Sequence, residues 1–250
     1  MSAGWLAIAG LGPGAETLVT PEVRDALALA TDVIGYAPYV ARVAPRPGLT
    51  RHASDNRVEL DRAGLALALA QAGRRVVVVS SGDPGVFAMA AAVFEAIEQG
   101  PPEWRSLDVR VLPGITAMLA AAARAGAPLG HDFCAINLSD NLKPAALIAR
   151  RLLLAAEADF AIALYNPRSV ARPDTLDAAF ALLRDAGAGE RLVLFARAVS
   201  TSEETLRVVP LAGARGEMAD MRTLVIVGSS RTRLIARDGT PWLYTPRSAA

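Results

Sequence analysis

Short apolar runs alternate along this chain with longer segments whose apolar residues recur at helical spacing. One run, Val76–Val79, has four consecutive β-branched residues, which is typical of a strand buried on both faces in a parallel sheet covered by helices. Ser80–Gly82 end this strand, and an alanine-rich helical segment follows from Val86. Open α/β sheets bind ligands where the carboxyl end of a strand leads into the next helix, so this crossing is a candidate site.

The same analysis predicts an α/β order for the rest of the first half. Thr20 followed by Pro21 is a helix-start signal. The predicted elements are a strand at Trp5–Ala9, a helix from Pro21 to about Ala30, a short strand ending at Ile34, a loop over 45–54, a helix from Asp55 to Ala72, a strand at Leu107–Leu112 and a helix over Ala117–Ala125.

A polar segment that contains glycine and proline, Gly126–His131, interrupts the alternation. We place a domain boundary there, with one α/β domain over 1–126 and a second over 127–250. The second sheet is expected to be mixed, because two late strands have no helix between them. Its strands are predicted at Phe133–Asn137, Phe160–Tyr165, Leu192–Ala196, Arg207–Val209 and Thr223–Val227, its helices at Pro144–Glu157 and Pro173–Asp185, and a loosely ordered tail after Arg231.

Glycine, proline and small polar residues follow five of the predicted strands. These turns are Gly10–Ala15, Gly82–Gly85, Pro113–Thr116, Tyr165–Arg168 and Gly228–Ser230. We expect all five at one edge of their sheets, forming a cleft for a flat or extended small molecule. Gly10–Ala15 also fits a loose dinucleotide fingerprint, but Pro13 lacks the N–H that a pyrophosphate needs, and no acidic residue ends the next strand.

Two residues near these turns have two interpretations each. Asp83 is the only charged residue between Arg75 and Glu95, and it either caps a helix or presents a carboxylate to a ligand. Tyr36, with Tyr39 close by, belongs either to the core or to the wall of a cleft.

Amino-acid composition argues against several kinds of function. Hydrophobic residues make up 52% and the net charge is +1, which indicates a globular protein without a large field toward nucleic acid or a membrane. One cysteine, Cys134, and two histidines are too few for a structural zinc site, so we expect no metal. The lone cysteine and the absence of a signal-peptide pattern or membrane-length apolar run favour a cytoplasmic protein.

Several enzyme classes lack their motifs here. The chain contains no G-x-S-x-G elbow, no Walker loop and no H-E-x-x-H sequence, which excludes the corresponding hydrolases, NTPases and zinc proteases. His52 falls in the predicted polar loop, where we expect exposure to solvent.

The turns, in this order, resemble the tetrapyrrole methylase family. This resemblance rests on three short stretches: GLGPG from Gly10 with Leu18 and Thr20, SGDP from Ser81, and PGITA from Pro113. Longer stretches resemble those members that methylate C-17 of a precorrin and contract its ring in cobalamin synthesis. They are Gly35–Tyr36 with Tyr39, SSGDPGVFAMA from Ser80, GAPLGHDFCAINLSD from Gly126, ALYNPRS from Ala163 and RTLVIVGSS from Arg222.

The resemblance implies two α/β domains with a cleft between them, a homodimer, and S-adenosyl-L-methionine as the methyl donor. Carried over by position, the cofactor contacts are Pro13, Gly82, Asp83, Phe87, Thr116, Ala117, Leu164, Ala196 and Ala198. An in-line methyl transfer needs alignment and no protein nucleophile.

Ring contraction requires proton transfer at oxygen. The acid–base candidates are Tyr36, His52, Asp55 and Asp140, which the sequence does not rank. Arg57, Arg168 and Arg197 are the candidates for pairing with the carboxylates of the tetrapyrrole, because a guanidinium binds a carboxylate through two hydrogen bonds.

Two alternatives stay open. One is a methylase of the same family that acts at another ring carbon or on a cobalt-loaded substrate. The other is a non-catalytic module that binds adenosylmethionine or a nucleotide. Turnover separates an enzyme from the binding module.

Overall fold

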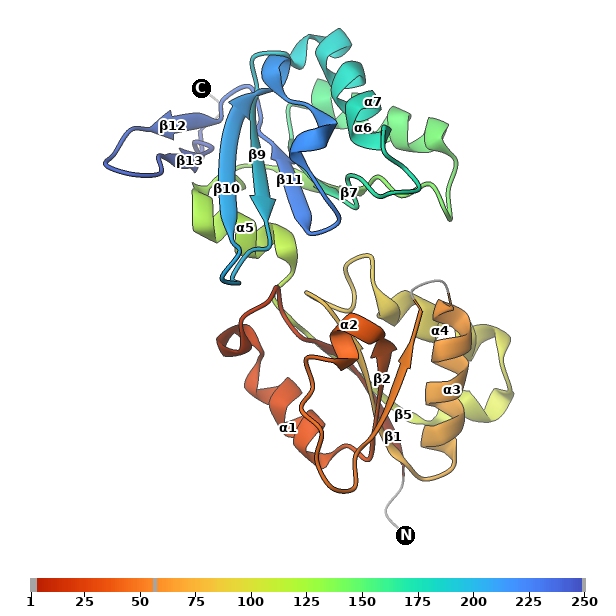
Figure 1. The fold of residues 1–250 in the computed structure, drawn as a ribbon. Helices are drawn as coiled ribbons and strands as arrows, with labels where there is room; N and C mark the ends of the chain where they lie inside the picture. The colour runs from red at the N-terminus through yellow and green to blue at the C-terminus, as the bar shows by residue number, and fades with distance from the viewer. Residues whose placement is uncertain (1–3, 56–57, 249–250) are drawn as a thin grey trace. The chain divides into compact units, whose positions relative to one another are not determined.

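The computed structural model describes residues 4–55 and 58–248 and divides into two compact units, 1–116 and 117–250 (Figure 1). The boundary therefore lies before the predicted one after Gly126. Helix α5 (Ala117–Ala125), which the sequence placed in the first domain, belongs to the second unit because it packs against β11 (Thr223–Val227) and β13 (Trp242–Tyr244).

The first unit contains one parallel five-stranded sheet with strand order β3-β2-β4-β1-β5. Its strands are β1 (Trp5–Gly10), β2 (Asp32–Tyr36), β3 (Thr50–Ser54), β4 (Arg75–Ser80) and β5 (Asp108–Leu112). Its helices are α1 (Pro21–Leu29), α2 (Ala37–Val40), α3 (Glu59–Gln71) and α4 (Met89–Gln99), with short 3₁₀ turns η1 (Glu16–Leu18) and η2 (Pro102–Ser106).

Strand β4 is the centre of this sheet, as its four valines predicted. All four are fully buried. Side chains alternate across a strand, so Val76 and Val78 join the core beneath α3 and α4, while Val77 and Val79 join the core beneath α1 and α2. Helices on both faces of the sheet explain why this strand has no polar alternation.

The second unit contains a mixed sheet with strand order β10-β9-β11-β8-β7, which confirms the mixed-sheet prediction. Its strands are β7 (Phe133–Asn137), β8 (Ala161–Tyr165), β9 (Leu192–Arg197), β10 (Thr205–Pro210) and β11. Within the described residues, β7 and β8 are the only two strands of this sheet that pair in parallel. The helical segments are α6 (Ala145–Glu157), α7 (Thr175–Leu183), the π-helical turn η3 (Arg184–Ala188), and the 3₁₀ turns η4 (Leu211–Gly213) and η5 (Gly216–Met218).

Two predictions about secondary structure are wrong. The tail after Arg231 is not loose, because β12 (Arg233–Ile235) and β13 form a small sheet with β6 (Gly126–Ala127). Residues 50–54 are not loop but the edge strand β3, which pairs with β2 from Asp32 to Tyr36. Polar residues are common on an edge strand, since one side of it has no neighbour, and this explains why its composition looked like a loop.

A buried carboxylate joins β2 and β3 to Arg74, the residue before β4. Asp32 is 2% exposed and accepts hydrogen bonds from Arg74 Nε (2.7 Å) and the Thr31 hydroxyl (2.8 Å), and His52 Nε2 lies 2.9 Å from its other oxygen. Burial alone raises the pKa of Asp32, but the hydrogen bonds from Arg74, His52 and Thr31 outweigh it and hold the pKa below the ordinary 3.8.

We expect Asp32→Asn to lower the free energy of unfolding at pH 7 by about 1–3 kcal/mol, because it weakens three hydrogen bonds to a buried carboxylate. The folded pKa is lowered, so this stabilisation is fully present above pH 3.8 and is lost as the pH falls through the folded value. Urea unfolding at pH 7, 5 and 3 measures the difference, which should be the same at pH 7 and pH 5 and smaller at pH 3. Asp108→Asn, which breaks the exposed pair with Arg110, is the control and should change little.

Candidate active site

Three glycines bring the carboxyl ends of β4, β1 and β5 into direct backbone contact. A Cβ atom on Gly10 would lie 2.5 Å from the carbonyl oxygen of Gly82 and 2.8 Å from the Cα of Gly114. A Cβ on Gly114 would lie 2.1 Å from the same Gly82 oxygen. Gly10 and Gly114 are therefore required by the approach of one strand end to the next, whatever a ligand requires.

The loops after β1 and β4 also exchange backbone hydrogen bonds. Gly12 N–H donates to the Gly82 carbonyl (3.1 Å), and Gly82 N–H donates to the Gly12 carbonyl (2.9 Å). Both glycines have left-handed φ angles, +65° and +63°, which glycine adopts without strain. This pairing continues the sheet one step beyond the strands and fixes the loop that contains Pro13.

Asp83 fastens the β4 loop to the β5 loop. Its Oδ2 accepts the Gly114 N–H (3.0 Å), and its Oδ1 accepts the Gly85 N–H (2.8 Å). It caps no helix, because α4 starts six residues later, at Met89, after a residue without a side-chain cap. Both oxygens thus receive backbone donors, and this carboxylate is the one acidic group in the sequence of the three glycine-containing loops.

A half-buried arginine that the sequence analysis missed holds the β1 loop from the other side. Arg42 donates to the carbonyls of Leu11, Gly12 (3.2 Å) and Gly14 (3.2 Å). Burial lowers the pKa of this guanidinium. No sequence motif signals this contact, since it joins residues about thirty positions apart.

Left-handed backbone at residues other than glycine recurs near the predicted site. Phe87, with φ +54°, follows the β4 loop, Asn166 (φ +50°) follows β8, and Ala198 (φ +48°) follows β9. The Phe87 side chain is 48% exposed, so packing does not explain the cost of this conformation for a bulky residue. Such strain is often found at functional sites, which marks Phe87 as a candidate contact.

Tyr36 and Asp55 lie at neighbouring strand ends on the same edge. Tyr36 pairs in register with Ser54, the residue before Asp55. The Tyr36 ring packs edge-on against Tyr39, with ring centroids 5.3 Å apart. Buried Arg62, a second residue that the sequence analysis missed, donates to the Ser54 hydroxyl (3.0 Å) and to the Asp55 carbonyl, and so fixes the start of this loop. Arg57 lies outside the described residues.

His52 is not on a polar loop but on β3, where its Nε2 contacts Asp32. Asp32 begins β2 and Tyr36 ends it, so this bond turns the imidazole away from the end of the sheet that carries Tyr36. His52 also borders a hollow of about 160 Å³ together with Ser54 and Arg62. The structure therefore brings Tyr36 and Asp55 together, and it gives His52 a structural partner.

In the second unit, the predicted residues also gather at one edge. Strands β7 and β8 are parallel and β11 is antiparallel to both β8 and β9, so β7, β8 and β9 end at the same edge. The Tyr165 hydroxyl accepts the Met118 N–H (3.1 Å), which brings the first turn of α5 to this edge. Gly228–Ser230 follow β11 and lie at the opposite edge, so the prediction that all five turns share an edge is wrong.

The side chains at this second edge differ in their freedom to bind a ligand. Arg197 forms ion pairs with Asp220 (2.7 Å) and Glu203 (3.5 Å), whereas Arg168 donates to the Pro173 carbonyl (3.0 Å). Asp140 lies 3.8 Å from Arg172.

Most of the predicted cofactor contacts near this edge are buried. The core encloses Leu164, Ala196 and Ala198. Thr116, at the end of the first unit, is also buried, while Ala117 is half-buried. Contacts from the buried alanines and Leu164 would have to use the main chain.

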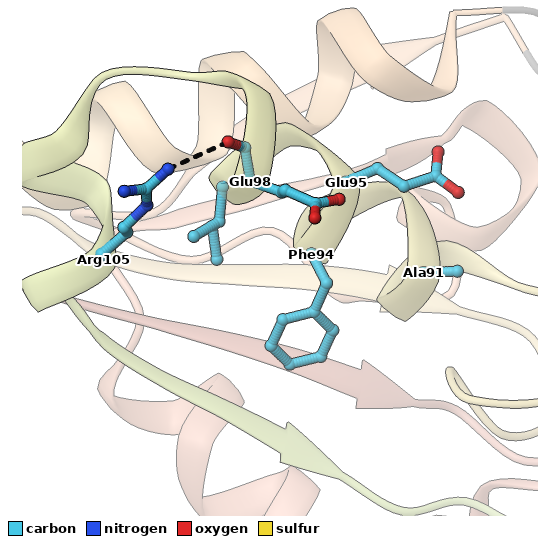
Figure 2. A pocket seen from close by; sticks show the side chains of 6 residues that line it. Ala91, Phe94, Glu95, Glu98 and Arg105 are labelled. Carbon is cyan, nitrogen blue, oxygen red and sulfur yellow. Dashed lines mark hydrogen bonds between the residues drawn. The ribbon is translucent and has the colours of Figure 1, made fainter.

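A second hollow lies within the first unit. It is an open depression of about 640 Å³ along α4 and η2, where Phe94 stands between Ala91, Glu95 and Glu98, and Arg105 donates to the Glu98 carbonyl (Figure 2). None of the described site candidates lines it. Within residues 4–55 and 58–248, no cluster of three His, Cys, Asp or Glu side chains is arranged to hold a metal, and no helix is long and apolar enough to cross a membrane.

Residues 6–214 match the family model of the Tetrapyrrole (Corrin/Porphyrin) Methylases. The chain belongs to this family. A precorrin-3B C(17)-methyltransferase from Sinorhizobium sp is 57% identical over 98% of this chain and 96% of its own length. A probable cobalt-factor III C(17)-methyltransferase from Salmonella typhimurium is 38% identical over 97% of this chain and 98% of its own length.

Solved structures agree with this family assignment. The methyltransferase CobJ superposes with a TM-score of 0.93 at 63% identity, over 97% of this chain and all of CobJ. A uroporphyrin-III C-methyl transferase from Thermus thermophilus, solved with S-adenyl homocysteine, has a TM-score of 0.70 at 22% identity, over 90% of this chain and 97% of that chain. The second likeness is one of fold. Together they confirm the predicted α/β fold of a tetrapyrrole methylase.

In this tetrapyrrole methylase, Asp83→Ala removes the acceptor for two backbone N–H groups. We expect the free energy of unfolding to fall by about 1–3 kcal/mol without any ligand, because Gly114 N–H is left without its partner. Chemical denaturation of the ligand-free protein measures this, with Asp25→Ala on α1 as the control. Unchanged stability would show that Asp83 does not join the two loops in solution.

Proposed function

We propose that this protein transfers a methyl group from S-adenosyl-L-methionine to C-17 of precorrin-3B and contracts the ring to precorrin-4 in cobalamin biosynthesis. The observation that carries the proposal is the 57% identity to a precorrin-3B C(17)-methyltransferase over almost the full length of both chains.

The residues at the first edge fit adenosylmethionine. The Asp83 carboxylate is the negative charge of the three glycine-containing loops, and the exposed Phe87 ring offers an apolar face for a purine. Pro13, Gly82, Asp83 and Phe87 from this edge, with Thr116, Ala117, Leu164, Ala196 and Ala198, are the residues that we propose hold the cofactor. When bound, it supplies the methyl group as an electrophilic carbon on a sulfonium.

The protein's own contribution is alignment. Holding the ring carbon at attack distance is worth roughly 7–11 kcal/mol. The backbone pairing of Gly12 with Gly82 and the bonds of Asp83 fix the loops before any ligand binds, so little order has to be gained during the reaction.

We assign the proton transfers of ring contraction to Tyr36 and Asp55. Both lie at the end of neighbouring strands, and Arg62 fixes the backbone of the Asp55 loop. Asp140 remains a candidate, and His52 is the weakest one because Asp32 occupies its Nε2.

For the carboxylates of the tetrapyrrole, we propose Arg168 and Arg57, with Arg197 in a lesser role. Arg197 is already paired with Asp220 and Glu203, so a substrate carboxylate would have to compete with both. Arg168 donates to the backbone carbonyl of Pro173, and within the described residues it forms no ion pair.

We further propose a homodimer located in the cytoplasm. The β12–β13 strands expose Leu234, Ile235 and Trp242 at 43%, 45% and 46%, which supports a covered face in an assembly. The single cysteine, half-buried Cys134, supports a reducing compartment. Light scattering of the purified protein measures the assembly, and fractionation of the producing cell measures the location.

The proposed reaction is tested by incubating the protein with precorrin-3B and adenosylmethionine labelled with ¹³C in the methyl group, followed by mass spectrometry and carbon NMR. One labelled methyl at C-17 with a new acetyl carbonyl is the expected result. A label at another carbon would overturn the substrate assignment and keep the methylase activity. Label incorporated only with a cobalt-containing substrate would favour the activity named for the Salmonella relative.

We expect Phe87→Gly to weaken S-adenosylhomocysteine binding about tenfold while leaving the melting temperature unchanged or higher. The exposed ring contributes little burial, and glycine relieves a left-handed conformation that costs roughly 1–3 kcal/mol. Calorimetric titration and thermal unfolding measure the two effects. Equal loss of affinity and stability would mean that the ring supports the fold, and Phe94→Gly on α4 is the matched exposed control.

A further inference from the structure

Arg42 stands out among the arginines of the first unit because its guanidinium binds three carbonyls of one short loop. The acceptors are Leu11, Gly12 and Gly14, with Nη1 and Nη2 at 3.2 Å from Gly12 and Gly14. Among the described residues it forms no ion pair, so these three carbonyl dipoles are what stabilises its charge. Burial accordingly lowers its pKa.

The loop that it binds has few other restraints on this side. Gly12 pairs with Gly82, and Leu11 N–H donates to the Ser80 carbonyl (2.8 Å), which fixes the side toward β4. Pro13 has no N–H and cannot join such a pairing. The carbonyls on both sides of Pro13, those of Gly12 and Gly14, are held by the one guanidinium.

From this geometry we infer that Arg42 is a positioning residue for the cofactor site, holding Pro13 and its neighbours in the conformation that adenosylmethionine binds. This inference rests on the proposed function, which places the cofactor against this loop. Three hydrogen bonds from a charged donor order the loop before binding, so the protein does not spend binding free energy on ordering it.

Arg42 lies shortly after α2, the short helix that contains Tyr39. This helix begins directly after Tyr36, the last residue of β2. Its own N–H donates to the Tyr39 carbonyl (3.1 Å). The side chain therefore spans from the tyrosine turn to the β1 loop, and a lysine cannot replace it, because one ammonium group does not reach the same three acceptors in the fork geometry of a guanidinium.

Arg46 offers a matched control within the same segment. It too donates to backbone carbonyls, those of Leu27 (2.9 Å) and Ala30 (2.6 Å). These lie at the end of α1, which leads into the start of β2, and the start of β2 is opposite the edge that carries the site. Arg46→Gln thus removes the same kind of bond without touching the β1 loop.

The test measures S-adenosylhomocysteine affinity by calorimetric titration, together with thermal unfolding and methyl-transfer kinetics, for the wild type, Arg42→Gln, Arg42→Lys and Arg46→Gln. We expect the dissociation constant to rise about tenfold or more in Arg42→Gln and by less in Arg42→Lys, with unchanged affinity in Arg46→Gln. The Michaelis constant for adenosylmethionine should rise in the same order, more than the turnover number falls at saturation.

Equal affinity in the wild type and both Arg42 variants would overturn the inference, and so would an equal loss in Arg46→Gln, which would show a general effect of stability. If Arg42→Gln does not fold, Arg42→Lys decides alone, and wild-type affinity in it would overturn the inference. A wild-type protein that does not bind S-adenosylhomocysteine would instead refute the proposed function.

Discussion

The first unit depends on the contact between three strand ends whose backbones approach more closely than any side chain allows. Gly10 ends β1, whereas Gly82 and Gly114 follow β4 and β5, and a methyl group on Gly10 or Gly114 would overlap the main chain at a neighbouring strand end. The close approach of these strand ends lets Gly12 and Gly82 exchange two backbone hydrogen bonds and places the Gly114 N–H beside the Asp83 carboxylate. The rigidity of the candidate site follows from this packing.

The buried elements were predictable because their signals are local. Four valines identify a central strand, and Thr20–Pro21 identify the start of a helix. In the structure, the Thr20 hydroxyl accepts the Val23 N–H at this helix start. The glycine loops were likewise recognisable as parts of a family motif. What a glycine is needed for was not predictable, since the backbone that excludes a side chain belongs to another strand end, 72 positions away for Gly10 and Gly82 and 32 positions away for Gly114 and Gly82.

The residues that the sequence analysis missed share a physical cause. Arg42 and Arg62 act by donating to main-chain carbonyls, and every residue has a carbonyl, so no partner type appears in the sequence. His52 illustrates the reverse case. A polar neighbourhood suggested a loop, whereas pairing with Asp32 on the adjacent strand decides its position. Antiparallel pairing of β11, which also sends Gly228–Ser230 to the far edge, is a property of topology that local composition does not encode.

The small sheet of β12, β13 and β6 has a consequence for the order in which the chain is completed. Strand β13 lies near the carboxyl end of the chain and pairs in parallel with Gly126–Ala127, directly after α5. Gly126–Ala127 therefore cannot pair until Leu243–Tyr244 have been synthesised, whereas the last strand of the first unit ends at Leu112. During synthesis, the first unit can fold while α5 still lacks the strands of the second unit that it packs against.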